Sequence, residues 1–104
     1  MLAAAAAASA LVLLHGTVTI GPTSPVCHAD TPCTKPAARI LIEFTRYGHI
    51  AMATTDAKGR YSVKLTAGTW TVLATRGVRI TPAKIIVRTV ATQKRDFAID
   101  TGIR

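Results

Sequence analysis

Residues 55–72 read TDAKGRYSVKLTAGTWTV, and this stretch decides the fold. Apolar and polar side chains alternate along both of its halves. A period of two places successive side chains on opposite faces of a strand, so each half predicts a half-buried β-strand. The apolar positions that would face the interior are Tyr61, Val63, Leu65, Trp70 and Val72.

Two turns punctuate this stretch. Asp56 can accept a hydrogen bond from a nearby backbone amide, and Gly59 can adopt a positive φ, which together favour a hairpin turn. Gly68, just before the second strand, predicts another tight turn. The stretch is therefore expected to contain the end of one hairpin and the start of the next.

The same alternation continues outward in both directions. Seven strands are expected, over residues 17–20, 38–45, 50–54, 61–65, 69–75, 84–90 and 96–100. Because short strands recur without a helical period, we predict an all-β fold, a seven-stranded antiparallel Greek-key sandwich. The expected core positions are Ile40, Ile42, Phe44, Tyr61, Val63, Leu65, Trp70, Val72, Phe97 and Ile99.

The spacing of Asp56, Gly59, Tyr61, Gly68 and Trp70 resembles the central hairpins of carboxypeptidase regulatory-like domains, which are transthyretin-like sandwiches. The resemblance is strongest over residues 55–72, and the strand spacing extends it over 16–104. It implies a non-catalytic accessory or surface domain and carries over no catalytic residue. Residues 21–36 depart from the family, since many members have a short loop there.

The N-terminal segment, residues 1–15, is apolar and includes six consecutive alanines at 3–8. A helix of this length is too short for the roughly 30 Å core of a bilayer. It has the length of the apolar part of a signal peptide, although no Lys or Arg precedes it. We therefore expect a secreted or cell-surface protein with its domain over 16–104, and no stable membrane span. A loosely packed N-terminal helix is the alternative.

Cys27 and Cys33 are the only two cysteines. A close pair in a small exported domain predicts a disulfide. Two free buried thiols and a metal site are weaker alternatives, because a structural zinc site needs four ligands.

The charge is strongly basic: 13 Lys and Arg face 5 Asp and Glu, for a net charge of +8. An excess of this size attracts anionic polymers over long distances. Four basic residues of the last third are the candidates for an anion-binding stripe: Lys84, Arg88, Lys94 and Arg95. The alternative is that the charge serves only solubility.

Other functions find little support in the residues. Glu43 is the only glutamate, the five acids are scattered, and no nucleophile motif is present, so we expect neither an enzyme nor a cofactor or metal site. A carbohydrate platform needs exposed aromatic rings, and Tyr47 alone is expected to be free. Few aromatics are available for stacking on bases, so nucleic acid is not expected as a specific partner. An anionic cell-surface polymer or another extracellular protein remains.

Overall fold

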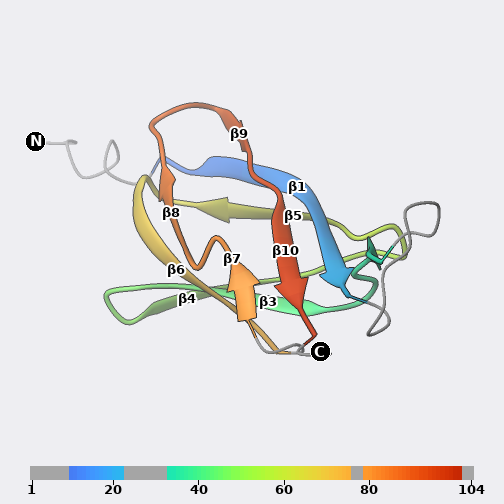
Figure 1. Cartoon of the computed structure of the whole chain (residues 1–104). Helices are drawn as coiled ribbons and strands as arrows, with labels where there is room; N and C mark the ends of the chain where they lie inside the picture. The colour runs from blue at the N-terminus through green and yellow to red at the C-terminus, as the bar shows by residue number, and fades with distance from the viewer. Residues whose placement is uncertain (1–9, 23–32, 76–78, 102–104) are drawn as a thin grey trace, which may run out of the picture.

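The computed structural model describes residues 10–22, 33–75 and 79–101, and these form ten strands in two sheets without a helix (Figure 1). The strands are β1 (Val12–Gly21), β2 (Lys35–Pro36), β3 (Leu41–Arg46), β4 (His49–Thr54), β5 (Arg60–Leu65), β6 (Gly68–Ala74), β7 (Arg79–Thr81), β8 (Lys84–Val87), β9 (Thr92–Lys94) and β10 (Phe97–Asp100). The expected all-β architecture is confirmed. Three short strands, β2, β7 and β9, were not expected from the sequence.

The four-stranded sheet has the order β4-β3-β6-β8, and all its neighbours are antiparallel. Residues of alternate parity point inward, so that Ile42, Phe44 and Val72 are buried while Leu73 and Ile86 are exposed. The two-residue alternation along these strands therefore correctly predicts which side chains face the core.

The six-stranded sheet is organised around β1. Its second half lies between β2 and β10, and its first half lies between β5 and β9. The pairings with β9 and β10 are parallel, so the expectation of a wholly antiparallel sandwich is wrong at β1. The chain reaches β9 through the loop after β8 and enters it in the same direction as β1.

Strand β1 also begins earlier than expected. Val12 and Leu14 belong to it, both are buried, and Leu14 has no exposed surface. The boundary predicted between residues 15 and 16 therefore falls inside β1. Residues 1–9 lie outside the described residues.

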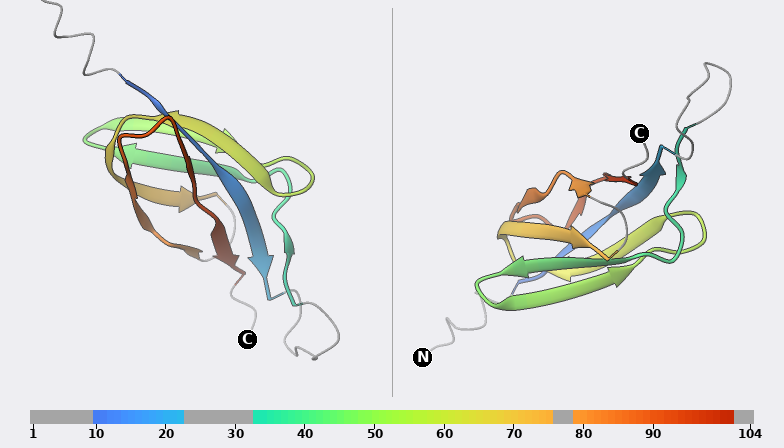
Figure 2. Two further views of the ribbon diagram at one scale, coloured as in Figure 1. Left: turned by 90° about the horizontal axis from the view of Figure 1, so that it is seen from above. Right: turned by 60° about the horizontal axis from the view of Figure 1, so that its bottom comes forward.

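The core lies between the two layers, which Figure 2 shows from two further sides. Three aromatic rings meet at its centre: Phe44 packs against Tyr61 and Phe97 with centroid distances of 6.2 and 6.1 Å, and Tyr61 and Phe97 are 5.6 Å apart. Of the ten expected core residues, nine are buried and Val63 is partly buried against them.

Candidate anion-binding surfaces

The four basic residues singled out in the sequence do not share one sheet face. Lys84 lies on β8 and Arg88 directly after it, at the edge of the four-stranded sheet. Lys94 lies on β9 and Arg95 follows it, in the six-stranded sheet. The expected stripe is thus divided between the two layers.

Arg95 is partly turned into the protein. Its Nε is buried without a hydrogen-bond partner, and its carbonyl oxygen accepts a hydrogen bond of 2.5 Å from the Tyr61 hydroxyl. Burial is the main cause that raises the pKa of Tyr61, so the phenol stays protonated as a donor. Lys94 lies 4.0 Å from Asp96. Both residues therefore make contacts at the connection from β9 to β10, and they are only partly available to bind an anion at the surface.

Most basic side chains in the described part of the chain have no acidic partner there. Of the 13 Lys and Arg residues, Arg76 and Arg104 lie outside the described residues, which leaves eleven. Only Arg60 and Lys94 form an ion pair with an acid among the described residues. The other nine charges are unneutralised there, so their field extends into solvent.

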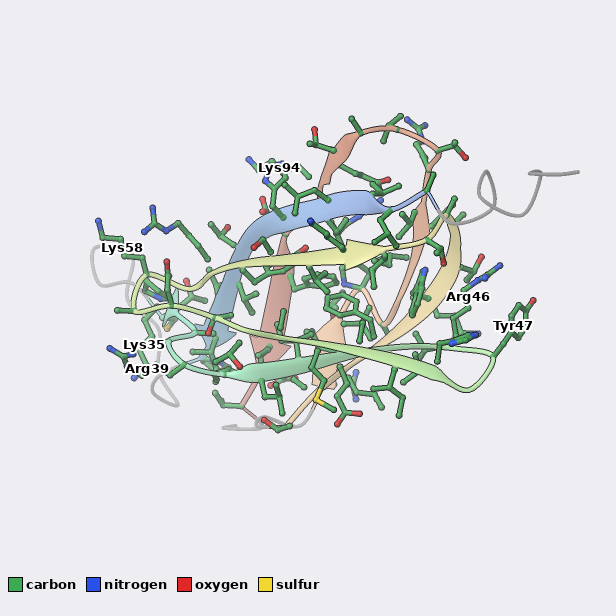
Figure 3. All side chains as sticks on the ribbon, turned by 180° about the vertical axis from the view of Figure 1, so that it is seen from behind. Lys35, Arg39, Arg46, Tyr47, Lys58 and Lys94 are labelled. Atoms are coloured by element: carbon green, nitrogen blue, oxygen red, sulfur yellow. The ribbon has the colours of Figure 1, made fainter. Side chains whose placement is uncertain are left out.

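Three of these nine gather at one end of the sandwich, which we call the basic end: Lys35, Arg39 and Lys58. Figure 3 shows their side chains at the same side, opposite Arg46 and Tyr47. All three are exposed. They come from β2, from the connection between β2 and β3, and from the turn between β4 and β5, so only the fold brings them together.

Backbone contacts hold these three segments together. The amide of Arg39 donates to the carbonyl of Thr55 at 3.1 Å, and the amide of Ala37 donates to that of Val18 at 2.8 Å. Inside, the Thr55 hydroxyl accepts a hydrogen bond from the amide of Ile40 at 2.8 Å and donates to the carbonyl of Ala37. Thr55 is buried, so its hydroxyl fixes the connection on which Arg39 lies.

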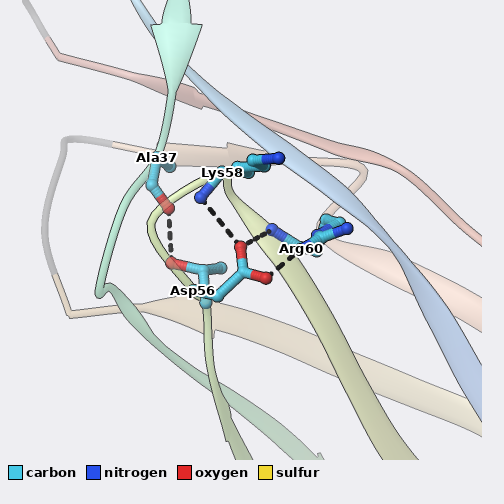
Figure 4. Close-up of polar contacts among 5 residues, drawn as sticks. Ala37, Asp56, Lys58 and Arg60 are labelled. Atoms are coloured by element: carbon cyan, nitrogen blue, oxygen red, sulfur yellow. Dashed lines mark hydrogen bonds and ion pairs between the residues drawn. The ribbon is translucent and has the colours of Figure 1, made fainter.

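Asp56 orders the turn that carries Lys58 (Figure 4). Its Oδ1 accepts hydrogen bonds of 2.9 Å from the amides of Lys58 and Arg60, and its Oδ2 forms an ion pair of 2.9 Å with the guanidinium of Arg60. The amide of Arg60 is the largest cause that lowers the pKa of Asp56, so the carboxylate is charged at neutral pH. Because Arg60 pairs with it, Asp56 leaves the charge of Lys58 free for another anion.

Gly59 adopts the positive φ that its turn predicts, and Gly68 begins β6 with a positive φ that was not predicted. Gly59 has φ 78° and Gly68 has φ 140°, both in the region that side chains disfavour. Tyr47 has φ 47° and is 88% exposed at the turn between β3 and β4, whereas the other four aromatic residues are buried. A single exposed ring among the described residues gives little support to a carbohydrate-binding platform, which needs exposed aromatic rings.

Cys33 precedes β2, while Cys27 lies outside the described residues, so the pairing of the two stays a prediction.

Within the described ranges, no three His, Cys, Asp or Glu side chains are placed to hold a metal ion together. In that same part of the chain, no helix has the length and apolar character needed to cross a membrane. The chain matches no family model and no curated protein.

Proposed function

We propose that the chain is a small, exported, non-catalytic β-sandwich module that binds anionic polymers of the cell surface through its basic end. The observation that carries this proposal is the gathering of Lys35, Arg39 and Lys58 beside a turn whose only acid is already paired with Arg60. These cations have no acidic partner among the described residues, and such exposed cations can exchange their counterions for the charges of a polyanion.

The resemblance of residues 55–72 to regulatory-like domains supports an accessory module of the transthyretin-like kind, with a Greek-key path through its longer strands. Export is compatible with the fold if a signal sequence is cut before Val12, because Val12 and Leu14 are part of the core. N-terminal sequencing of the mature protein tests this point. A mature chain that begins after Leu14 would contradict the sandwich, because it would lack two residues of the core, and an uncleaved chain would contradict export by a cleaved signal sequence.

Retention on a phosphate-bearing resin tests the binding itself. The test variant carries Lys35→Gln, Arg39→Gln and Lys58→Gln. The matched control carries Lys84→Gln, Arg88→Gln and Lys94→Gln, so each variant loses one Arg and two Lys. All the substituted side chains are exposed, and equal melting temperatures verify the fold.

We expect the basic-end variant to elute at clearly lower salt than the control variant, and the unchanged protein to elute last. Retention should fall steeply as salt rises, since the attraction between exposed charges is screened. Equal shifts for the two variants would mean that only the net charge matters. That result would favour a structural subunit with a solubilising charge. A neutral-polysaccharide resin serves as the test of the carbohydrate alternative.

A further inference from the structure

An open cleft of about 820 Å³ lies at the end of the sandwich opposite the basic end. Its walls come from the start of β1, the β3–β4 hairpin, the β5–β6 connection and the loop between β8 and β9. Six lining residues matter for its chemistry: Arg46, His49, Lys64, Leu65, Trp70 and Val90. A volume of this size suits a small organic ligand.

Arg46 is held in place at this cleft without an acidic partner. Its guanidinium lies flat on Gly68, where an added Cβ would come within 2.5 Å of Cζ and 2.6 Å of Nη2. Its Cζ also lies 4.8 Å from the centre of the Tyr47 ring. The guanidinium therefore rests over the open backbone of Gly68 and beside the Tyr47 ring, and both contacts place it at the cleft before any ligand arrives. Less conformational freedom is then lost on binding.

The other polar groups of the cleft are also donors or cations. Lys64 is exposed and has no ion pair among the described residues, and His49 stands opposite Arg46 in the register of β3 and β4. None of the described residues that line the cleft is an Asp or Glu. The cleft therefore selects for a negatively charged group.

The remaining wall is apolar. Trp70 is 4% exposed, and its Nε1 already donates to the carbonyl of Thr66 at 2.9 Å, so the indole offers only its carbon surface. Leu65 is buried behind it, whereas Leu11 and Val90 remain 53% and 44% exposed at the rim. An apolar body placed at this rim would cover the surface of Leu11 and Val90 that water now contacts.

We propose that this cleft binds an amphiphilic anion, a small molecule with one acidic group on an apolar body. The acid pairs with Arg46 and Lys64, and the apolar body lies against Trp70 and Val90. This site is separate from the basic end and needs no polymer.

Trp70 is the only tryptophan of the chain, so its fluorescence reports directly on this cleft. The probe is decanoate, added to the full chain below its micelle-forming concentration. Acetate is the anion without the apolar body, and decyltrimethylammonium is the apolar body with the opposite charge. We expect a saturable change of fluorescence with decanoate and none with the two controls. No saturable change with decanoate, or an equal change with decyltrimethylammonium, would overturn the proposal.

Two pairs of variants locate the acid. Arg46→Gln is matched by Arg39→Gln, and Lys64→Gln by Lys58→Gln, so that each loss of charge at the cleft has an equal loss at the basic end. Because hydrogen bonds to a charged group are strong, Arg46→Gln should weaken decanoate binding by roughly tenfold or more. Arg39→Gln should leave decanoate binding unchanged. Equal effects of the two arginine variants would place the ligand elsewhere.

The same variants separate this inference from the proposed function. Arg46→Gln should lose less retention on the phosphate resin than Arg39→Gln, and the triple variant of the basic end should keep its affinity for decanoate. The last experiment measures binding of the protein to vesicles of anionic lipid. Binding to vesicles without saturable binding of monomeric decanoate would assign the surface to a membrane and reject the small-molecule site.

Discussion

The carboxylate of Asp96 takes the place of a backbone carbonyl opposite Thr17. Its Oδ1 accepts a hydrogen bond of 2.9 Å from the Thr17 amide, at the point where β9 has ended and β10 has not begun. On either side, His15 pairs with Lys94 and Val18 with Phe97 in the same parallel register. One side chain thus bridges the gap between two short strands and keeps both aligned with β1.

This contact makes stability depend on pH. The amide of Thr17 is the largest cause that lowers the pKa of Asp96 below its ordinary 3.8, and Lys94, the Thr17 hydroxyl and His15 lower it further. A lowered pKa in the folded state stabilises the fold above the ordinary value, and this gain is lost as pH falls through the folded value. Asp96→Asn should therefore lower the free energy of unfolding at pH 7.

Urea unfolding of both proteins at pH 7 and pH 2 measures this effect. The difference between Asp96→Asn and the unchanged protein should be smaller at pH 2 than at pH 7, because the native carboxylate is progressively protonated as pH falls toward and through its lowered pKa. A difference that is the same at both pH values would show that charge plays no part in the contact.

Thr55→Val tests the buried hydroxyl beneath the basic end. Valine has nearly the same shape but leaves the Ile40 amide and the Ala37 carbonyl without their partner. Leaving buried polar groups unpaired should cost about 1–3 kcal/mol of unfolding free energy. Thr54→Val is the matched control on the exposed side of β4, where a change within about 0.5 kcal/mol is expected. Similar losses in chemical denaturation would contradict the role of Thr55.

Gly59→Ala separates backbone strain from close contact. A Cβ at Gly59 would lie 2.5 Å from the carbonyl oxygen of Val18 and 3.1 Å from the amide of Ala37. Gly48 has a similar φ, 82°, and nothing lies within 4 Å of its added Cβ. Gly48→Ala should thus cost only the left-handed strain, roughly 1–2 kcal/mol. Gly59→Ala should cost clearly more in thermal unfolding, and an equal loss would mean that β1 simply moves away.

Trp70→Ala should destabilise the domain by about 3–5 kcal/mol, because it removes a large buried ring and leaves a cavity. Leu73→Ala on the same strand is the control, since Leu73 is on the exposed face. Its unfolding free energy should change little. A stable Trp70→Ala protein would mean that the ring contributes to binding alone.

Cys27 and Cys33 are predicted to form a disulfide. Alkylation without reduction, followed by mass spectrometry of the intact chain, should then leave both thiols unlabelled. Two added alkyl groups would reject the prediction. In the loop-closure model, a ring of about seven residues stabilises by on the order of 2 kcal/mol, so replacement of both cysteines by Ser should lower the unfolding free energy by a similar amount.

The local pattern predicts much of the fold. Alternation alone placed Phe44, Tyr61 and Trp70 inward, because a strand has only two faces and one of them packs on the core. Asp56 and Gly59 predicted their turn because few residues combine an acceptor side chain with a positive φ. Both signals act within a few residues and need no knowledge of the rest of the chain.

What depended on contacts between distant segments could not be predicted. Residues 12–14 form a continuous apolar run in which Val12 and Leu14 face the core and Leu13 is half-buried on the other face, and that run resembled part of a leader. The prediction that Lys84, Arg88, Lys94 and Arg95 form one stripe was wrong, because β8 and β9 belong to different sheets. Lys35, Arg39 and Lys58 carried no signal, since only the folded backbone brings their segments together.

The parallel pairing of β1 with β9 and β10 also determines the mechanical resistance of the domain to a pulling force. The start of β1 and the end of β10 lie at opposite ends of one ladder, about 30 Å apart at roughly 3.3 Å per residue. Tension on the chain before β1 and after β10 therefore slides the strands past each other. The bonds from Leu13 to Ala91 at one end and from Thr101 to Gly21 at the other are loaded together. Strands β3 and β4, joined by a tight hairpin, would instead peel apart one bond at a time. A pulling experiment should accordingly find a higher rupture force across β1 and β10 than across that hairpin, and equal forces would show that the parallel ladder is no mechanical clamp.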